Sequence, residues 1–505
     1  MAAKRGIGTL VRGSTESVFL STADGPPLTY AEVDDRIDRL AGWLVANGIG
    51  PGDRIAIQMG NRPEVAIAMF AAARIGAIFV VLNEELRPHG LAKIFAQAEP
   101  RVFVADDSTR TDAVDADVRI CCGAADGGWI RFDDALAHDP IDEVPEFSVD
   151  DPACLVFTSG STGSPRGVTL SHENITFVVD AIQRRLGYRA DDVVGGFLPL
   201  SFDYGLYQVF LAALAGANLF IGHPGMVGPR LPRVLETAGI TVLPGVPTLY
   251  SALIALHSRR PFELPSLRAI TNTGQRLPGA HIERLGEMFP DLRVFVMYGL
   301  TECKRVSILL PEELADHGDS VGRPLDGTEV YAVDESGARR PAGVAGELVV
   351  TGPHVAYHGY WRAPDETRAR YRPGPDGRRE SIELFTGDMG FVDDEGFVHF
   401  AARADDLLKH RGHRISPIEI EEEASRIRGV VEACVVLDGS NDRLHLVARR
   451  SDEELTGTAM LADLADKLEP AKVPDEVHFV DELPRSMNGK TDRAALTTWI
   501  TSGAP

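Results

Sequence analysis

The chain has 505 residues, a length that predicts about three domains, or one large domain with a small companion. Its hydrophobic fraction of 44% is ample for buried cores and excludes wholesale disorder. Acidic residues outnumber basic residues by 74 to 51, and the net charge of −23 argues against broad, nonspecific binding to nucleic acid or anionic membranes. This charge still leaves room for a local site that binds a small anion.

Cysteine usage and the first residues indicate a reducing, cytoplasmic setting. The five cysteines show no CxxC spacing, so we expect neither a disulfide framework nor a structural zinc site. Residues 1–20 lack the apolar core and the small-residue cleavage pattern of a secretory signal. The most apolar stretch, residues 65–82, contains Arg74 and Gly76, which favours a buried helix followed by a strand over a membrane span. We therefore expect no nucleic-acid or membrane partner.

The first 150 residues alternate predicted helices with predicted strands. A helix start is predicted at Thr29–Glu32 and a short strand at 54–57, after a Gly-Pro-Gly turn. An alanine-rich helix pattern covers 63–74, and a strand pattern covers 77–82. Further strands are predicted at 193–198, 217–221 and 241–243. This alternation predicts an α/β fold in which the large N-terminal domain contains parallel-rich sheets covered by helices.

From about Gly346 the pattern changes to short strands, at 346–350 and 396–400, which we interpret as a small β-barrel-like part of the large domain. The patterns after Arg403 are mixed, with helices over 417–427 and 460–468 and strands over 433–437 and 444–448. We expect these elements to form a small, mobile α+β domain. The predicted boundary separates a large domain, residues 1–404, from this small domain, residues 405–505.

The stretch Thr158–Gly167, TSGSTGSPRG, carries the strongest chemical signal, and it follows a buried-strand pattern at 154–157. Its three glycines let backbone amides turn toward one point, and its hydroxyls add neutral donors. Arg166 adds a fixed positive charge. A polyphosphate requires these groups, although the Walker spacing GxxxxGK[ST] is absent. Taken alone, the stretch is equally compatible with a flexible surface loop.

Further motifs follow this loop in a fixed order. They are Tyr298–Glu302 (YGLTE), Thr386–Asp388 (TGD), Arg403–Glu419 and Leu483–Lys490 (LPRSMNGK). Together with the loop, they resemble the signature motifs of the adenylate-forming superfamily, which includes acyl-CoA synthetases, luciferases and the adenylation domains of peptide synthetases. The resemblance spans residues 28–493. Two positions depart from the family pattern: Arg166 stands where lysine is usual, and Ala402 where glycine is usual.

The resemblance implies an enzyme that catalyses two half-reactions. A carboxylate attacks the α-phosphorus of ATP, which gives an acyl-adenylate and pyrophosphate, and a thiol then displaces AMP. Because a carboxylate is a poor electrophile, the first step converts one of its oxygens into part of a leaving group. The protein would contribute positioning and charge neutralisation, with ATP and Mg²⁺ as the implied cofactors.

By resemblance, the loop and the later motifs would bind ATP. The residues assigned to the nucleotide are Thr158, Ser159, Gly160, Ser161, Thr162, Gly163, Arg166, Gly167, Gly274, Tyr298, Asp388 and Arg403. Thr301 would donate to the α-phosphate, and the Glu302 carboxylate would bind Mg²⁺, a hard cation. Asp388 would accept hydrogen bonds from the ribose hydroxyls, and Tyr298 would stack on adenine.

Lys490 and Asp405 are implied to act at different stages. Lys490 would be the catalytic lysine of adenylation, able to bridge the attacking carboxylate and the α-phosphate. Asp405 occupies the family's hinge position, about which the small domain would rotate between the half-reactions. We interpret His172 as part of a helix start and Cys303 as a small packing residue.

The acyl pocket is assigned by the same resemblance. Its candidate residues are Asp203, Tyr204, Tyr207, Pro244, Thr271, Thr273, Met297, Arg305 and Val306. Asp203 would pair with the ammonium group of an amino acid, and the alternative is a capping or turn aspartate before a helix. Arg305 would either meet a second carboxylate or pair with Asp203 and leave no site for an amine.

The thiol acceptor is left open, because CoA and carrier proteins both present phosphopantetheine. The short segment 437–443 lacks a loop common in CoA synthetases, and this favours a carrier protein that acts in trans. The leading hypothesis is a stand-alone ligase that loads a small acid, with a lean to an amino acid, onto a carrier protein. The alternatives are an AMP-forming acyl-CoA ligase and a non-catalytic nucleotide-binding relative.

Overall fold

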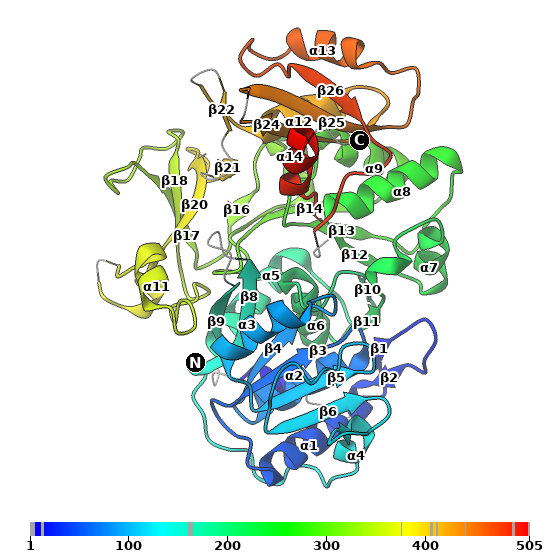
Figure 1. Cartoon of the computed structure of the whole chain (residues 1–505), viewed down its shortest axis with the longest axis vertical. Helices are drawn as coiled ribbons and strands as arrows, with labels where there is room; N and C mark the ends of the chain where they lie inside the picture. The colour runs from blue at the N-terminus through cyan, green and yellow to red at the C-terminus, as the bar shows by residue number, and fades with distance from the viewer. Residues whose placement is uncertain are drawn as a thin grey trace.

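The computed structural model describes residues 6–11, 15–159, 165–374, 376–403, 408–410, 413–439, 441–486 and 490–502. In these residues the chain forms two large sheets, a smaller antiparallel sheet and a C-terminal α+β unit (Figure 1). The N-terminal sheet lies at the bottom of this view and the C-terminal unit at the top. Short 3-10 turns occur at Ile7–Thr9, Pro224–Met226, Pro311–Glu313 and Arg379–Ser381.

The first large sheet has the strand order β7-β6-β5-β3-β4-β8-β9. Its strands are β3 (Arg54–Gln58), β4 (Ile78–Leu82), β5 (Val102–Asp106), β6 (Val118–Cys122), β7 (Ile130–Arg131), β8 (Pro152–Ser159) and β9 (Pro165–Ser171). The helices along this part of the chain are α1 (Tyr30–Ala46), α2 (Pro63–Arg74), α3 (Pro88–Ala98) and α4 (Phe132–Leu136). Neighbouring strands are parallel except β8 and β9, which are antiparallel. These two strands hold both ends of the predicted phosphate loop at the sheet edge.

The second large sheet has the order β16-β15-β14-β13-β12-β10-β11-β1-β2. Its strands are β1 (Val18–Ser21), β2 (Leu28–Thr29), β10 (Val193–Gly196), β11 (Asn218–Ile221), β12 (Val242–Gly245), β13 (Ala269–Asn272), β14 (Arg293–Tyr298), β15 (Ser307–Leu309) and β16 (Arg323–Pro324). Its helices are α5 (His172–Leu186), α6 (Asp203–Ala215), α7 (Leu231–Thr237), α8 (Pro247–Arg259), α9 (Gly279–Met288) and α10 (Leu314–His317). Strands β10 and β12–β14 are parallel, so the segments that follow them meet at one edge, where α/β folds bind ligands.

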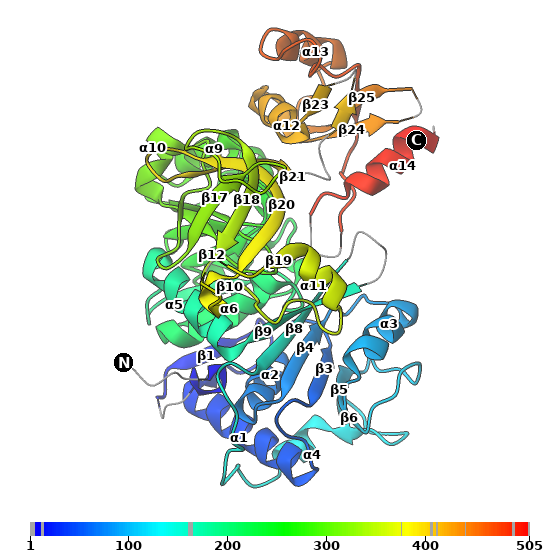
Figure 2. The same ribbon diagram turned by 90° about the vertical axis from the view of Figure 1, so that its left-hand side faces the viewer.

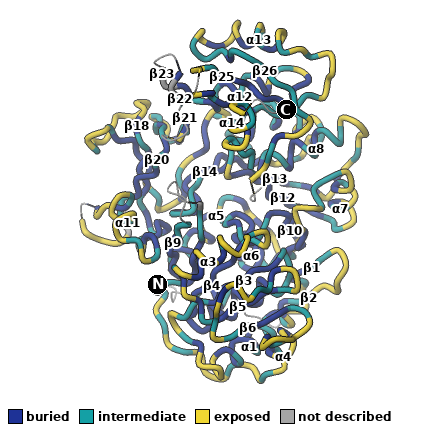
Figure 3. The backbone as a smooth tube through the Cα atoms, in the orientation of Figure 1, coloured by how far each residue is buried: buried dark blue, intermediate teal, exposed yellow. Residues whose placement is uncertain are grey.

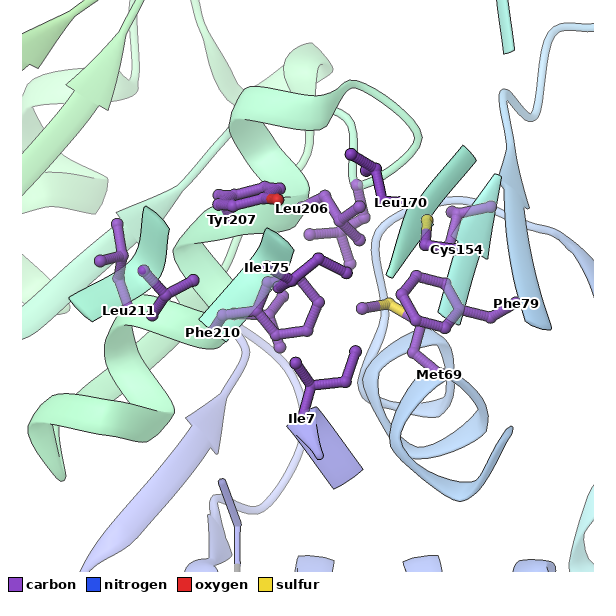
Figure 4. Close-up of a cluster of buried hydrophobic side chains, with 14 of the residues drawn as sticks. Ile7, Met69, Phe79, Cys154, Leu170, Ile175, Leu206, Tyr207, Phe210 and Leu211 are labelled. Carbon is purple, nitrogen blue, oxygen red and sulfur yellow. The ribbon is translucent and has the colours of Figure 1, made fainter. Parts of the chain in front are cut away.

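A shared apolar core joins the two large sheets, and the strands on both sides of it are buried (Figure 3). Figure 4 shows Phe210 of α6 between the two layers, near Phe79 of β4 and Met69 of α2. The Phe210 ring centroid lies 5.8 Å from that of Phe70 and 6.4 Å from that of Phe79. Helix α6 is almost entirely buried because it lies between sheets, and this burial fixes the position of its first residue, Asp203.

The smaller sheet is antiparallel, and α11 (Pro364–Arg370) accompanies it. Its strands are β17 (Glu329–Val333), β18 (Gly346–Thr351), β19 (Tyr371–Arg372), β20 (Glu383–Val392) and β21 (Val398–Arg403). Asp388 of β20 and Arg403 of β21 are direct partners in the register. This pairing brings two residues of the predicted nucleotide site together on neighbouring strands.

The C-terminal unit stands above the second large sheet (Figure 2). It contains β22 (Leu408–His410), β23 (His413–Ile415), β24 (Val430–Asp438), β25 (Arg443–Arg450), β26 (Glu476–Phe479), α12 (Pro417–Arg426), α13 (Gly457–Ala465) and α14 (Arg493–Ser502). Arg276 forms a 2.6 Å ion pair with Glu422 of α12. His281 Nε2 lies 3.2 Å from the carbonyl oxygen of Val431. These contacts hold the C-terminal unit against α9 and the segment before it.

The fold confirms the predicted α/β class, with its parallel-rich sheets and small C-terminal α+β part. Thr29 caps α1 through a capping box with Glu32, as the sequence predicts. The apolar stretch 65–82 forms most of α2 and then β4. Of the helices that the structure describes, none is long and apolar enough to cross a bilayer. The predicted domain boundary at residues 404 and 405, and with it the hinge Asp405, lies outside the described residues.

One predicted helix begins earlier than its apolar pattern suggests. The pattern predicts a helix over 460–468, whereas α13 runs from Gly457 to Ala465. The hydroxyl of Thr456 accepts a hydrogen bond from the backbone nitrogen of Ala459, so the cap starts the helix before the first apolar residue.

Candidate active site

Asp388, Tyr298 and Arg403 come together on the nucleotide side of the candidate site. The Tyr298 hydroxyl donates to Asp388 Oδ2 over 2.6 Å, and Arg403 Nε lies 3.6 Å from Oδ1. Among the described residues, the buried Oδ1 of Asp388 has no hydrogen-bond partner. Burial raises the pKa of Asp388 to about 6, although Tyr298 and Arg403 oppose the rise. A buried acceptor in need of a donor fits a ribose hydroxyl.

Glu302 follows β14 and is held by a tyrosine from a distant part of the chain. The hydroxyl of Tyr360 donates to Glu302 Oε1 over 2.6 Å. The Arg166 guanidinium lies 5.8 Å from the centre of the Tyr360 ring. A carboxylate oriented in this way offers oxygen to a hard cation, so Glu302 would suit Mg²⁺ as a ligand.

The predicted phosphate loop is described at its two ends. Thr158 and Arg166 face each other across β8 and β9, and Phe157 faces Gly167. A Cβ added to Gly167 would lie 3.0 Å from the Phe157 ring, so this position favours glycine. The predicted site residues Gly160, Ser161, Thr162 and Gly163 lie outside the described residues, as does the side chain of Ser159.

Lys490 reaches the site from the C-terminal unit. A Cβ built on Gly274 would lie 3.1 Å from Lys490 Cε, and the φ of +86° at Gly274 favours glycine at this position. Lys490 Nζ lies 5.3 Å from the centre of the Phe202 ring. Burial lowers the pKa of Lys490, with Asp203 opposing and Arg403 reinforcing that change. The structure therefore brings the predicted adenylation lysine to Gly274 and toward the start of α6.

Asp203 is the first residue of α6 and follows the N-cap residue Phe202. Its place in the first turn of the helix is compatible with the alternative of a capping or turn aspartate, which therefore stays open. Asp203 Oδ2 accepts a hydrogen bond from Thr301 Oγ1 over 3.0 Å and lies 3.5 Å from Lys304 Nζ. Burial opposes ionisation, yet the charges of Lys304 and Lys490 and the hydrogen bond from Thr301 lower the pKa of Asp203. Thr301, predicted to donate to the α-phosphate, here donates to Asp203.

Arg305 lies beside this pair without bonding to Asp203. Its Nη1 donates to Thr273 Oγ1 over 2.5 Å, and its guanidinium lies 5.4 Å from the centre of the Tyr204 ring. Its Nε is buried without a hydrogen-bond partner among the described residues. Burial lowers the pKa of Arg305. Asp203 forms its ion pair with Lys304, and the charges of Asp203 and Arg305 interact without an ion pair between them among the described residues.

Other predicted pocket residues are buried around these charges. The Tyr204 hydroxyl donates to the carbonyl oxygen of Thr271 over 2.5 Å. Lys304 Nζ lies 5.6 Å from the centre of the Tyr207 ring, and the buried Tyr207 hydroxyl has no hydrogen-bond partner in the described part of the chain. Met297 and Val306 are also buried, and Pro244 belongs to the buried strand β12.

Sequence reasoning missed three residues of the site. Lys304 directly precedes Arg305, and a second cation after the Thr-Glu pair was the signal that could have found it. Tyr360, which holds Glu302, and Phe202, which lies under Lys490, carry no local signal because their partners are distant in sequence. His172 starts α5, is fully buried and has a pKa lowered to about 4 by burial, and Cys303 is buried in the core. Both interpretations are confirmed.

Two family models match consecutive parts of the chain and identify its class. The model of AMP-binding enzymes matches residues 11–361, and the model of the AMP-binding enzyme C-terminal domain matches residues 419–490. The chain therefore belongs to the AMP-binding enzyme family, as the motifs predict. It is an adenylate-forming ligase that uses ATP to activate a carboxylic acid.

Individual relatives cover between 79% and 99% of this chain. A feruloyl-CoA synthase from Amycolatopsis is 32% identical over 92% of this chain and 92% of its own. The ATP-bound structure of MatB from Rhodopseudomonas palustris is 26% identical over 99% of both chains, with a TM-score of 0.84. The structure of VinN in complex with L-aspartate is 34% identical over 79% of this chain and 98% of that chain, with a TM-score of 0.70.

Proposed function

We propose that this ligase activates a small acid that carries an ammonium group and a second carboxylate, and that it transfers the acyl group to a phosphopantetheine thiol. The observation that carries this proposal is the buried charge set of the acyl pocket. Asp203 supplies one negative charge, whereas Lys304 and Arg305 supply two positive charges, and all three are largely buried.

The excess of positive charge favours a substrate with an anionic group besides the reacting carboxylate. A buried guanidinium is costly unless it is paired, and a planar guanidinium binds a carboxylate with two parallel hydrogen bonds. A second substrate carboxylate at Lys304 and Arg305 would draw Lys304 from Asp203. Asp203 would then accept from the substrate ammonium. The ammonium and the second carboxylate of the substrate would thus add one charge of each sign. The ammonium would pair with Asp203, and the carboxylate would pair with Lys304 and Arg305. Similarity to VinN, whose structure contains L-aspartate, supports this assignment.

For the first half-reaction, we combine the roles implied by the family motifs with the positions of the described residues. Arg166 and the amides of the phosphate loop would bind the β- and γ-phosphates, and Asp388 would accept from the ribose hydroxyls. Glu302 would hold Mg²⁺, which supplies neutralisation of the phosphate charge. Lys490 would hold the reacting carboxylate against the α-phosphate while the carboxylate oxygen bonds to phosphorus and pyrophosphate leaves. Positioning and electrostatic stabilisation are the main contributions of the protein.

In the second half-reaction a thiolate attacks the acyl carbon, and AMP leaves with the electron pair of the broken C–O bond. We propose a carrier protein as the acceptor, because the β24–β25 connection is short. An AMP-forming acyl-CoA ligase is the second candidate. It is favoured by the similarity to feruloyl-CoA synthase and by Asp203 already having Thr301 and Lys304 as partners.

Pyrophosphate exchange with matched acids tests the substrate class. L-aspartate should be activated at least about 100-fold better, in kcat/KM, than succinate, which lacks the amine, because Asp203 would be left without its partner. β-Alanine and L-alanine, which each lack one carboxylate of aspartate, should be similarly poor. Succinate equal to aspartate would refute the ammonium assignment.

A preference for ferulate or another uncharged acid would favour the acyl-CoA ligase instead. Thioester formation with free CoA and with a phosphopantetheinylated carrier protein separates the two acceptors. The control in both assays is Lys490→Ala, which should reduce adenylation by about 1,000-fold whatever the acid.

A further inference from the structure

Three potential metal ligands converge in the C-terminal unit, away from the residues of the active site. His445 lies on β25, and Glu476 and His478 lie on β26. The two strands are parallel, with His445 opposite Glu476 and Val447 opposite His478. Because side chains alternate across a strand, all three side chains extend from the same face of the sheet. That face also carries Val447, which packs with Leu496 of α14.

The ligand atoms are spaced as the corners of one coordination site. His445 Nδ1 lies 3.0 Å from His478 Nε2 and 3.4 Å from Glu476 Oε2, and His478 Nε2 lies 3.5 Å from the same oxygen. A tetrahedral zinc ion with bonds of about 2.0–2.1 Å separates its ligands by about 3.3 Å. The three distances fit one face of such a tetrahedron.

The surroundings of the three ligands resemble a supported metal site. Arg443 Nη2 lies 3.1 Å from Glu476 Oε1, so it holds the carboxylate oxygen that does not face the histidines. The Trp499 ring of α14 packs edge-on against His478, with centroids 5.6 Å apart. His445 is buried, whereas the side chains of His478 and Glu476 are 30% and 43% exposed. Orienting partners for the ligands and an open side toward solvent are features of sites with three protein ligands and one water.

We propose that His445, Glu476 and His478 bind a zinc ion that joins β25 to β26 beneath α14. The donor set of two imidazoles and one carboxylate suits Zn²⁺, and the remaining position would take water. The site contains no cysteine, so the expectation of no structural zinc, which rested on cysteine spacing, does not bear on it. The proposal is independent of the substrate, because none of the three ligands contributes to the active site described above.

Zinc titration of the full-length, tag-free protein after treatment with a chelator tests this site. The wild type should bind one equivalent of Zn²⁺ through these residues, and its melting temperature should rise with zinc concentration, because a ligand of the folded state stabilises it. Co²⁺ in place of zinc should give the intense visible absorption of a tetrahedral site. His478→Gln and Glu476→Gln, at the two partly exposed positions, should each weaken zinc binding by about 100-fold or more, since even loss of a supporting residue costs 10–100-fold.

The matched control is His223→Gln, which removes an exposed histidine outside the cluster and should leave zinc binding unchanged. Adenylation in the presence of Mg²⁺ should be the same in all four proteins, which shows that the variants are folded. Equal zinc affinity in wild type, His478→Gln and Glu476→Gln would overturn the proposal. So would a wild type that binds no zinc, in which case the two imidazoles and the carboxylate form a hydrogen-bonded cluster.

Discussion

The nucleotide side and the acyl side of this active site balance their charges in different ways. On the nucleotide side, each carboxylate is held by a tyrosine hydroxyl, Asp388 by Tyr298 and Glu302 by Tyr360. On the acyl side, the single carboxylate of Asp203 faces Lys304, and Arg305 lies beside them with a hydroxyl as its hydrogen-bond partner. The carboxylates of the nucleotide side can therefore accept hydrogen bonds from hydroxyl groups and bind a cation. The acyl side instead has one more positive than negative side chain.

This difference suggests a division of roles: the nucleotide side would carry out the reaction, and the acyl side would select the acid. The residues assigned to the nucleotide would act in steps that are the same for every acid, so short motifs are enough to predict them. The charged residues of the acyl pocket would act through their combined charge and the distances between them. Neither property can be inferred from a single residue. Changes on the nucleotide side should therefore affect all substrates alike, whereas changes on the acyl side should alter the preference among them.

The largest effect is expected from Lys490→Ala. Loss of the charge that holds the carboxylate against the α-phosphate should reduce adenylation by about 1,000-fold for every acid. Thioester formation from a presynthesised adenylate should continue. Pyrophosphate exchange and a thioester assay measure the two steps, with Lys467→Ala, at an exposed position just after α13, as the control. Adenylation at a near wild-type rate would show that Lys490 has another role.

Asp203→Ala should affect one class of acid. Removal of the partner of a buried ammonium costs about 3–5 kcal/mol, or a few hundred-fold or more in kcat/KM for the amino acid. The des-amino analogue should lose little, because it brings no charge in need of Asp203. Exchange assays with both acids, together with a melting curve, measure this change. An unchanged preference ratio would exclude the amino acid and leave the acyl-CoA ligase as the better hypothesis.

Arg305→Met should remove the advantage of a second carboxylate. We expect L-aspartate to lose about 100-fold in kcat/KM, while β-alanine changes little. Arg305→Lys should restore only part of the loss, because an ammonium cannot form the bidentate contact. Exposed Arg260 supplies the control, Arg260→Met. If both acids suffer equally, Arg305 supports the pocket without contacting the substrate.

The nucleotide side should respond to pH through Asp388. Its pKa of about 6 lies above the ordinary value of 3.8, so the unliganded folded state binds the proton more tightly than the unfolded state. This contribution to stability is present below pH 4 and is lost as pH rises through about 6, by about 3 kcal/mol in total. Ribose hydroxyls favour the ionised carboxylate, so ATP binding should weaken by up to about tenfold per pH unit below 6.

Calorimetry of ATP binding between pH 5 and 7.5, on wild type and Asp388→Asn, measures this dependence. The variant should bind ATP weakly at every pH and should lack the change near pH 6. The difference in melting temperature between the two proteins should shrink as pH falls below 5. An identical pH profile in both proteins would place the titration elsewhere.

The smallest effect is expected from the contact that holds the C-terminal unit. Glu422→Gln removes the partly buried ion pair with Arg276, worth about 1 kcal/mol. If this contact favours the arrangement in which Lys490 reaches the site, adenylation should fall by about fivefold and thioester formation should not. Single-turnover measurement of each half-reaction tests this, with Glu423→Gln on the same helix as the control. Equal changes in both steps would point to a loss of stability instead.

The sequence by itself determined the fold class and was enough to predict which residues form the nucleotide side. Periodicity, turns and caps are local, so the alternation of strands and helices and the starts of α1 and α5 follow from adjacent residues. The motifs are local too, which is why Asp388, Glu302 and Lys490 could be assigned by resemblance before any contact was known.

Tertiary structure decided how the charges are shared. Lys304 pairs with Asp203 across 101 positions, Tyr360 holds Glu302 across 58, and His445 meets His478 across 33. Each of these contacts depends on strands and helices that are brought together by burial of the shared cores, and the resulting distances cannot be obtained from neighbours in the chain. The same burial raises the pKa of Asp388 and leaves Arg305 in contact with Thr273 and Tyr204. A buried charged group is separated from water, so its pKa and its contacts depend on the protein groups that the fold places beside it.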